Sequence, residues 1–135
     1  MTTRSLLLDT NHATPLVDGS PWMLKRLREE QANVVLCWPI VGELWAGVAG
    51  SSDRRRDENR QRLDLILTAI DVLPFDAAAA RAFGQIKQQL KETGRPIPAI
   101  DIQLAAIAVT HAMPILSADR HLSYVDSLQV IDWTS

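Results

Sequence analysis

Four acidic residues of this sequence stand next to apolar segments, where a carboxylate needs a partner. Asp9 follows three leucines, Asp101 lies between two isoleucines, Glu43 precedes a leucine, and Asp119 comes soon after an Ile-Leu pair. Few basic residues are near them in the sequence, and clustered carboxylates without cations repel one another. Carboxylate oxygens are ligands that suit Mg²⁺ or Mn²⁺. Because such an ion activates water and stabilises the charge that develops in phosphodiester cleavage, the acids predict hydrolytic metal chemistry.

This chemistry requires secondary-structure elements that bring the four acids together. Short apolar runs predict strands, and apolar residues at helical spacing between these runs predict helices. The predicted strands lie within residues 6–8, 34–37, 71–75, 115–117 and 128–133, and the predicted helices cover residues 39–50, 53–70, 77–93 and 98–112. Strands that alternate with helices are typical of α/β proteins. We therefore predict a three-layer α/β/α sandwich with a mainly parallel central sheet.

A parallel sheet would place all four acids at one edge. Asp9 and Asp119 follow predicted strands, whereas Glu43 and Asp101 lie in the opening turns of predicted helices. Helices that follow parallel strands begin where those strands end, and ligands gather at this carboxyl edge. Each acid alone also has a structural explanation, because acids near helix N-termini stabilise by about 0.3–1 kcal/mol and Asp is common in turns. The four together favour a shared site.

The size and composition limit the class of protein. The chain has 135 residues, 47% hydrophobic and 22% charged, which predicts one compact domain over residues 1–135. Cys37 is the only cysteine, so the chain has no internal disulfide, in agreement with a cytoplasmic location. We predict no signal peptide, and no apolar run approaches the about 20 residues of a membrane-spanning helix. The net charge of −2 argues against nucleic-acid binding by bulk charge alone.

The four acids lie in four short motifs. These are LLLDTN at residues 6–11, GELWAG at 42–47, GRPIPAIDIQLAA at 94–106 and ILSAD at 115–119. In order and spacing they resemble the PIN-domain ribonucleases, and among these the VapC-type toxins of bacterial toxin–antitoxin pairs. The resemblance covers essentially the whole chain. It implies a PIN-like α/β fold and an endoribonuclease that depends on Mg²⁺ or Mn²⁺.

The resemblance also implies roles for individual residues and partners. The metal site and the catalytic residues would be Asp9, Glu43, Asp101 and Asp119. The hydroxyl groups of Thr10 and Ser117 would orient these carboxylates, and Asn11 would be a polar support. The implied partners are RNA as substrate, a second copy of the chain in a homodimer, and a small antitoxin whose C-terminal segment covers the acidic site.

Three further residues are predicted to contact RNA. His12 follows the first motif, and Arg120 and His121 follow Asp119, so all three are placed to meet a phosphate at the edge of the site. A loop histidine without a function is the competing interpretation of His12.

The residues alone leave other functions to weigh. A non-catalytic PIN-like module that binds a partner or RNA would share the fold, but the complete set of four acids argues against it. An aspartyl-phosphate protein would also place an Asp at the end of the first strand. Phosphatases of that kind need a second acid two residues later, where Asn11 stands. The sequence also lacks a Gly-x-Gly-x-x-Gly run and a P-loop, which argues against a nucleotide-binding fold.

Overall fold

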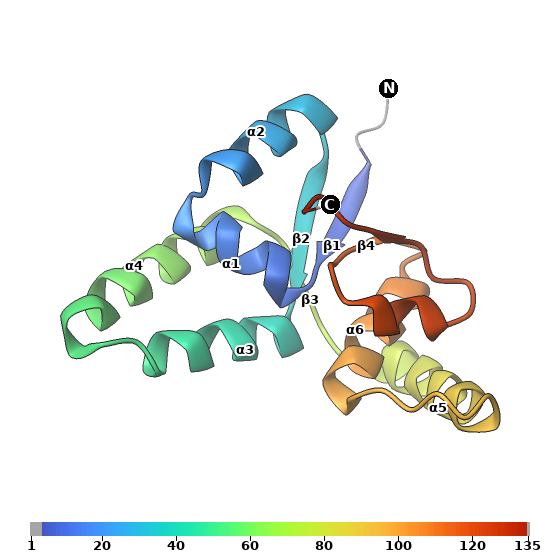
Figure 1. Ribbon diagram of the computed structural model, residues 1–135. Helices are drawn as coiled ribbons and strands as arrows, with labels where there is room; N and C mark the ends of the chain where they lie inside the picture. Colours follow the sequence, from blue (N-terminus) through green and yellow to red (C-terminus); the bar gives the residue numbers. More distant parts are fainter. Residues whose placement is uncertain (1–3, 135) are drawn as a thin grey trace.

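A parallel β-sheet forms the centre of the protein (Figure 1). The computed structural model describes residues 4–134, so residues 1–3 and 135 of the predicted domain lie outside the described residues. The strands are β1 (Ser5–Leu8), β2 (Asn33–Cys37), β3 (Val72–Leu73), β4 (Ile115–Leu116) and β5 (Val130–Ile131). Their order is β3-β2-β1-β4-β5, and each neighbouring pair is parallel. The carboxyl ends of all these strands therefore lie at one edge.

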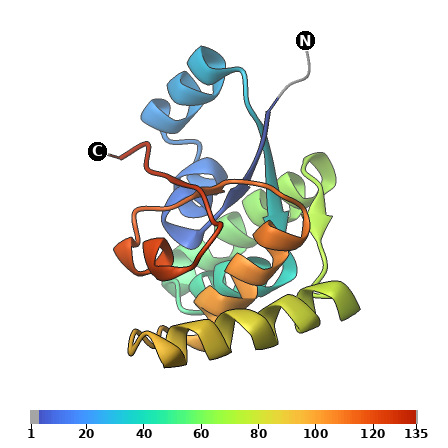
Figure 2. The same ribbon diagram turned by 90° about the vertical axis from the view of Figure 1, so that its right-hand side faces the viewer.

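Six α-helices within residues 4–134 cover this sheet. They are α1 (Thr10–Asp18), α2 (Pro21–Glu30), α3 (Trp38–Ala49), α4 (Asp53–Ala69), α5 (Ala77–Glu92) and α6 (Ala99–Thr110), and a 3₁₀-helix η1 (Arg120–Tyr124) follows β4. Figure 2 shows α5 and α6 in front of the strands and α1 and α3 behind them. Helix α5 packs against α6, and α1 packs against both α3 and α4. This arrangement confirms the predicted three-layer α/β sandwich.

The central strand is fixed by its apolar side chains. Leu6, Leu7 and Leu8 are fully buried, as expected for a strand that is covered on both faces. Each fully buried leucine stabilises the fold by about 1.5–3 kcal/mol. Because β1 pairs with both β2 and β4, the residue that follows it is held at the middle of the carboxyl edge.

Three elements were not predicted from the sequence. The polar residues after β1 predict a turn, whereas α1 begins at Thr10 and α2 follows it; η1 was also missed. Within the described range, every helix is too short or too polar to cross a membrane.

Candidate active site

Asp9 lies where β1 ends and α1 begins. It caps α1 from an extended backbone conformation (φ −79°, ψ 165°), and its Oδ1 accepts a hydrogen bond from the Thr10 backbone N–H at 2.7 Å. The hydroxyl of Ser117, which follows β4, donates to Oδ2 at 2.6 Å. Asp9 is buried, and both of its carboxylate oxygens are held by the protein. The carboxylate therefore has one fixed orientation.

Ser117 and Asn11 connect the ends of β1 and β4. The Ser117 Oγ accepts hydrogen bonds from the Asp119 backbone N–H (2.9 Å) and from the Asn11 side-chain amide (3.4 Å), while its proton is donated to Asp9. The Asn11 Oδ1 accepts from the Ala118 backbone N–H at 3.1 Å. These bonds link Asp9 to the segment that carries Asp119. Ser117 contacts the Asp9 carboxylate directly, whereas Asn11 supports Ser117 and the Ala118 backbone.

Thr10 acts differently from the prediction. Its hydroxyl was expected to orient a carboxylate, but the hydrogen bond from Thr10 to Asp9 is donated by the backbone N–H. The Thr10 side chain instead lines a groove that also contains Glu43. The reason is the helix geometry, because the cap residue accepts hydrogen bonds from backbone donors at the start of α1.

Asp101 lies in the first turn of α6, close to the other two aspartates. Burial raises the pKa of Asp101 to about 6, with further upward contributions from the charges of Asp119 and Asp9. The nearby Asp119 carboxyl raises the pKa of Asp101 further, whereas the charge of His121 acts in the opposite direction. The structure therefore brings Asp9, Asp101 and Asp119 into one site from three separate parts of the chain. Their negative charges repel one another there.

This repulsion should make the metal-free protein less stable at high pH. The folded-state pKa of Asp101 is raised, so its protonated form stabilises the fold at low pH, and this stability is lost as the pH rises through about 6. Because the carboxyl is partly open to water, solvent screening reduces the effect to about 1 kcal/mol. We expect Asp101→Asn to raise the melting temperature at pH 8 in EDTA by roughly 3–5 °C. At pH 4 the two melting curves should coincide, and an unchanged melting temperature at pH 8 would contradict the repulsion.

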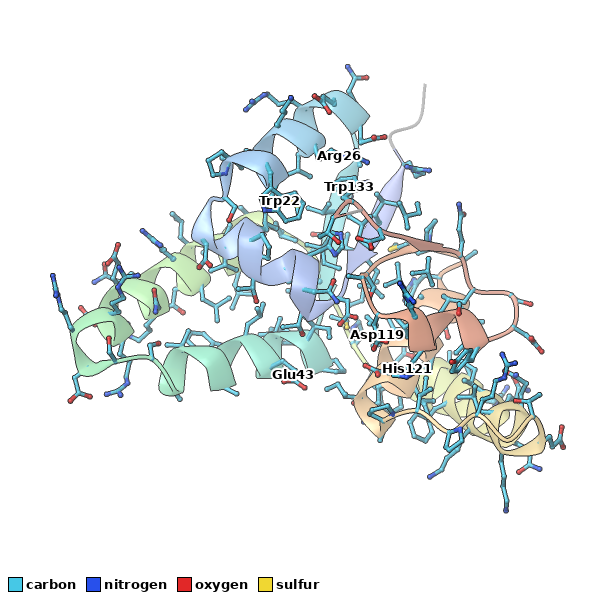
Figure 3. All side chains as sticks on the ribbon, in the orientation of Figure 1. Trp22, Arg26, Glu43, Asp119, His121 and Trp133 are labelled. Atoms are coloured by element: carbon cyan, nitrogen blue, oxygen red, sulfur yellow. The ribbon has the colours of Figure 1, made fainter. Side chains whose placement is uncertain are left out.

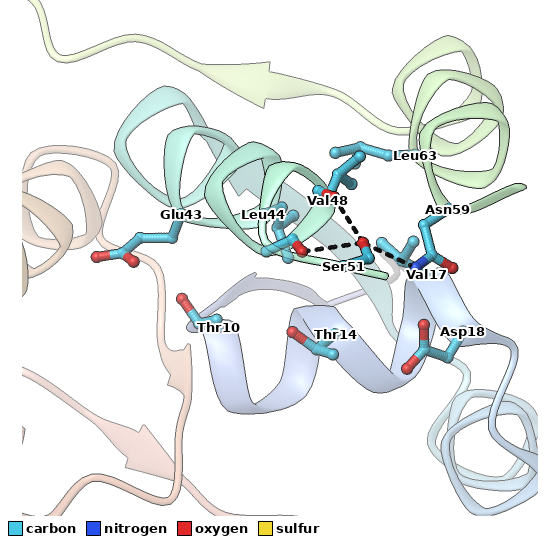
Figure 4. A pocket seen from close by; sticks show the side chains of 11 residues that line it. Thr10, Thr14, Val17, Asp18, Glu43, Leu44, Val48, Ser51, Asn59 and Leu63 are labelled. Carbon is cyan, nitrogen blue, oxygen red and sulfur yellow. Dashed lines mark hydrogen bonds between the residues drawn. The ribbon is translucent and has the colours of Figure 1, made fainter. Parts of the chain in front are cut away.

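Glu43 stands apart from the three aspartates at one end of a groove between α1, α3 and α4 (Figure 4). The groove has a volume of about 310 Å³, and its lining includes Thr10, Val17, Glu43, Leu44, Val48 and Leu63. Figure 4 shows the Glu43 carboxylate turned away from the Leu63 end of the groove. Figure 3 shows Glu43 on α3 and Asp119 beyond the end of β4, and α3 packs against α6, which carries Asp101. Glu43 therefore lines the groove, on a helix that packs against the helix carrying Asp101.

The predicted contact of His12 with substrate is wrong. His12 is fully buried in α1, so RNA does not reach it. Its Nε2 accepts the Trp133 backbone N–H at 3.1 Å, and its Nδ1, which must carry the proton, donates to Asn11 Oδ1 at 2.6 Å. Burial lowers the pKa of His12 below its usual value, although Asp132 and Asp9 act in the opposite direction. The buried face of α1 explains the difference, because the polar sequence after Asp9 resembles a loop.

His121 and Arg120 are exposed, as required for a contact with substrate, and Figure 3 shows His121 beside Asp119. The His121 ring nitrogen Nδ1 lies 3.1 Å from Asp119 Oδ1, and the His121 side chain is 59% exposed. Asp119 also caps η1 by accepting the His121 backbone N–H at 2.9 Å. The start of η1 therefore places both candidate RNA contacts next to Asp119.

The donor chemistry of the site fits a divalent cation. Within residues 4–134, no group of three His, Cys, Asp or Glu side chains is already arranged to hold a metal ion. Asp9, Asp101 and Asp119 nevertheless converge, and their repulsion is the kind that a divalent ion removes. Fold and site together define the class: a parallel α/β protein with three neighbouring aspartates at the carboxyl edge of its sheet.

Comparison with known proteins agrees with this class. The PIN domain model matches residues 6–128. The tRNA(fMet)-specific endonuclease VapC of Shigella flexneri is 29% identical over 130 residues, which cover 95% of this chain and 97% of that protein. Toxin FitB of Neisseria gonorrhoeae is 31% identical over 124 residues, covering 84% and 87%. A crystal structure of FitAcB from Neisseria gonorrhoeae has a TM-score of 0.84 at 28% identity, covering 96% of this chain and 98% of the matched chain.

The chain belongs to the PIN-domain family, because the family model spans most of its length. Its relatives include VapC endonucleases and a toxin, and the chain covers nearly the full length of the Shigella flexneri relative.

Proposed function

We propose that this protein is a metal-dependent endoribonuclease and the toxin of a toxin–antitoxin pair. The observation that carries the proposal is the convergence of Asp9, Asp101 and Asp119 at the carboxyl edge of a PIN-domain sheet. The names of its relatives, an endonuclease specific for a tRNA and a toxin, support the same activity.

We assign the metal site to Asp9, Asp101 and Asp119, with Glu43 at its border. When bound, Mg²⁺ or Mn²⁺ would polarise the scissile phosphate and lower the pKa of an attacking water. The protein's own contribution is orientation: Ser117 and the Thr10 backbone N–H hold the Asp9 carboxylate, and Asn11 holds Ser117. A carboxylate that is fixed before the substrate binds needs no reorganisation during the reaction.

The proposed protein partner is a small antitoxin. One of the similar solved structures is of FitAcB, and another is of VapBC from Salmonella typhimurium bound to DNA. The groove between α1, α3 and α4 suits a peptide segment, because Leu44, Val48 and Leu63 give it apolar walls and Glu43 stands at its end. A basic side chain of such a segment would pair with Glu43 and the aspartates. A homodimer and a cytoplasmic location are part of the same proposal.

A non-catalytic PIN-like module is the alternative, and metal binding separates the two. Carboxylates kept only for structure would not take up Mn²⁺, whereas the proposed site should bind it. Calorimetric titration of the purified chain with Mn²⁺ measures this directly.

The test of the proposed function is cleavage of total cellular RNA by the purified chain. We expect discrete products with Mg²⁺ or Mn²⁺ and none with EDTA, because the site needs a divalent ion. Cleavage that continues in EDTA would contradict the metal dependence. A folded sample that neither cleaves RNA nor binds Mn²⁺ would favour the non-catalytic module.

A further inference from the structure

A row of three side chains leads away from the acidic site across the surface. We call His121, Tyr124 and Arg95 the aromatic row. The ring centroids of His121 and Tyr124 are 5.8 Å apart, and the Arg95 guanidinium carbon lies 4.8 Å from the Tyr124 centroid. The row begins at Asp119, which lies 3.1 Å from the His121 ring.

The geometry of η1 produces this row. Residues three apart are eclipsed in a 3₁₀-helix, so His121 and Tyr124 stand one above the other. The neighbouring Leu122 is fully buried and Val125 is 3% exposed, which anchors the inner side of the segment in the core. The two rings are therefore placed on its outer side.

Helix α5 holds the segment in place. The Gln89 side chain donates to the Tyr124 carbonyl oxygen at 3.2 Å and accepts the Asp126 backbone N–H at 3.4 Å. The Ser123 hydroxyl donates to the Arg120 carbonyl oxygen at 2.6 Å. Contacts to α5 and within η1 thus fix the Tyr124 backbone before any ligand binds, which reduces the entropy lost on binding.

The groove beside the row suits bases better than phosphates. It has a volume of about 450 Å³, and its lining consists of Gln89, Thr93, Arg95, Ser123, Tyr124 and Asp126. The Asp126 carboxylate would repel a phosphate inside the groove, whereas amide and hydroxyl groups can bind the edges of bases. Arg120 is exposed and can meet the phosphates outside.

We infer that the aromatic row is a subsite for unpaired RNA bases that flank the cleaved phosphodiester. Single-stranded RNA is recognised by stacking of splayed bases on aromatic side chains and on Arg planes, with hydrogen bonds to the base edges. The row offers both groups in continuity with Asp119. This inference rests on the proposed function, and it makes the row a source of preference for looped or single-stranded RNA.

The test is the affinity of the full-length chain for single-stranded RNA. The probes are fluorescein-labelled oligouridine and oligoadenosine of about ten nucleotides, with fluorescence anisotropy measured in EDTA so that cleavage does not interfere. We expect Tyr124→Leu to weaken binding about tenfold, since it removes one stacking surface. Tyr124→Phe should retain the wild-type affinity because it keeps the ring. A hairpin-free RNA duplex should bind weakly to the wild type and equally weakly to both variants.

Phe75→Leu is the control, because Phe75 is an aromatic residue outside the row that packs edge-to-face on a neighbour, Phe83, at 5.9 Å, as Tyr124 does on His121. Melting curves of all variants report whether they fold. Equal affinity of Tyr124→Leu and the wild type would overturn the subsite, as would equal losses in Tyr124→Leu and Tyr124→Phe. Wild-type cleavage of total RNA, measured in parallel with Mn²⁺, shows whether the proposed function still holds. A wild type that neither binds nor cleaves RNA overturns both proposals.

Discussion

Asp9→Asn should abolish RNA cleavage while the protein remains folded. We expect the cleavage rate to fall by about 10²–10³-fold, the scale of loss when one electrostatic stabiliser is removed from a preorganised site. Asp9 is the carboxylate with both oxygens held by the protein, through Thr10 and Ser117. Asn preserves the shape of this side chain but removes its charge, so affinity for Mn²⁺ should fall in parallel.

The fold should survive this substitution for a local reason. The NH₂ group of the introduced asparagine must face either the Thr10 N–H or the Ser117 hydroxyl. Both of these groups donate a hydrogen bond to Asp9 in the native protein. One hydrogen bond is therefore lost or weakened, at a cost of about 1 kcal/mol. Weaker repulsion with Asp101 and Asp119 offsets part of this cost. A domain that is stable by about 5–15 kcal/mol remains folded.

Cleavage of total RNA with Mn²⁺, Mn²⁺ calorimetry and thermal melting together measure this prediction. Asp64→Asn is the matched control, because Asp64 lies on α4 in an exposed ion pair with Arg60 at 3.5 Å. Such pairs contribute little to stability, so this variant should behave as the wild type. Wild-type cleavage by Asp9→Asn, in a preparation free of other nucleases, would refute the assignment of the site.

The sheet and the three aspartates could be predicted because their sequence signals are local. A short apolar strand such as Leu6–Leu8 followed by Asp9 indicates both the strand and its carboxyl end, and the same holds for the β4 segment before Asp119. Once the strands are parallel, their carboxyl ends must share an edge. The convergence with Asp101 follows from this topology and does not require knowledge of side-chain contacts.

Helix α1 could not be predicted because its stabilisation comes from tertiary structure. Pro15 lies inside this nine-residue helix, where a proline removes one backbone hydrogen bond, and most of the residues before it are polar. Burial of His12, Ala13 and Leu16 compensates for these weak propensities. Helix η1 is shorter still, and its position depends on Gln89 from a distant helix.

The roles of side chains required the structure as well. The spacing of Glu43 placed it near the other acids, but the direction of its side chain toward a groove border depends on how α1, α3 and α4 pack. The hydrogen bond of His12 could not be predicted from the sequence, because its partner Trp133 is 121 residues away. Only the folded chain shows that this histidine connects the C-terminal segment to the residues that orient Asp9.

His12 provides the second prediction with a large effect. His12→Phe should lower the cleavage rate or the Mn²⁺ affinity by about 10–100-fold, the range typical of residues that orient metal ligands. The ring shape and the edge contacts with Trp22 (6.1 Å) and Trp133 (6.5 Å) would be kept. The donor to Asn11 would be lost, so Asn11 could rotate and release Ser117 from its present orientation.

A purely structural role of His12 makes a different prediction from an orienting role, and two further variants separate them. In His12→Asn the amide nitrogen is as many bonds from Cβ as the histidine Nδ1, so it can donate to Asn11. In His12→Gln the amide oxygen takes the place of Nε2, so it can accept the Trp133 backbone N–H. We expect both variants to melt at lower temperatures, because each leaves one buried group unpaired. Mn²⁺ affinity and cleavage should recover in His12→Asn but not in His12→Gln. If instead activity follows the melting temperature in all three variants, His12 only stabilises the fold, and Asn11 keeps its orientation without it.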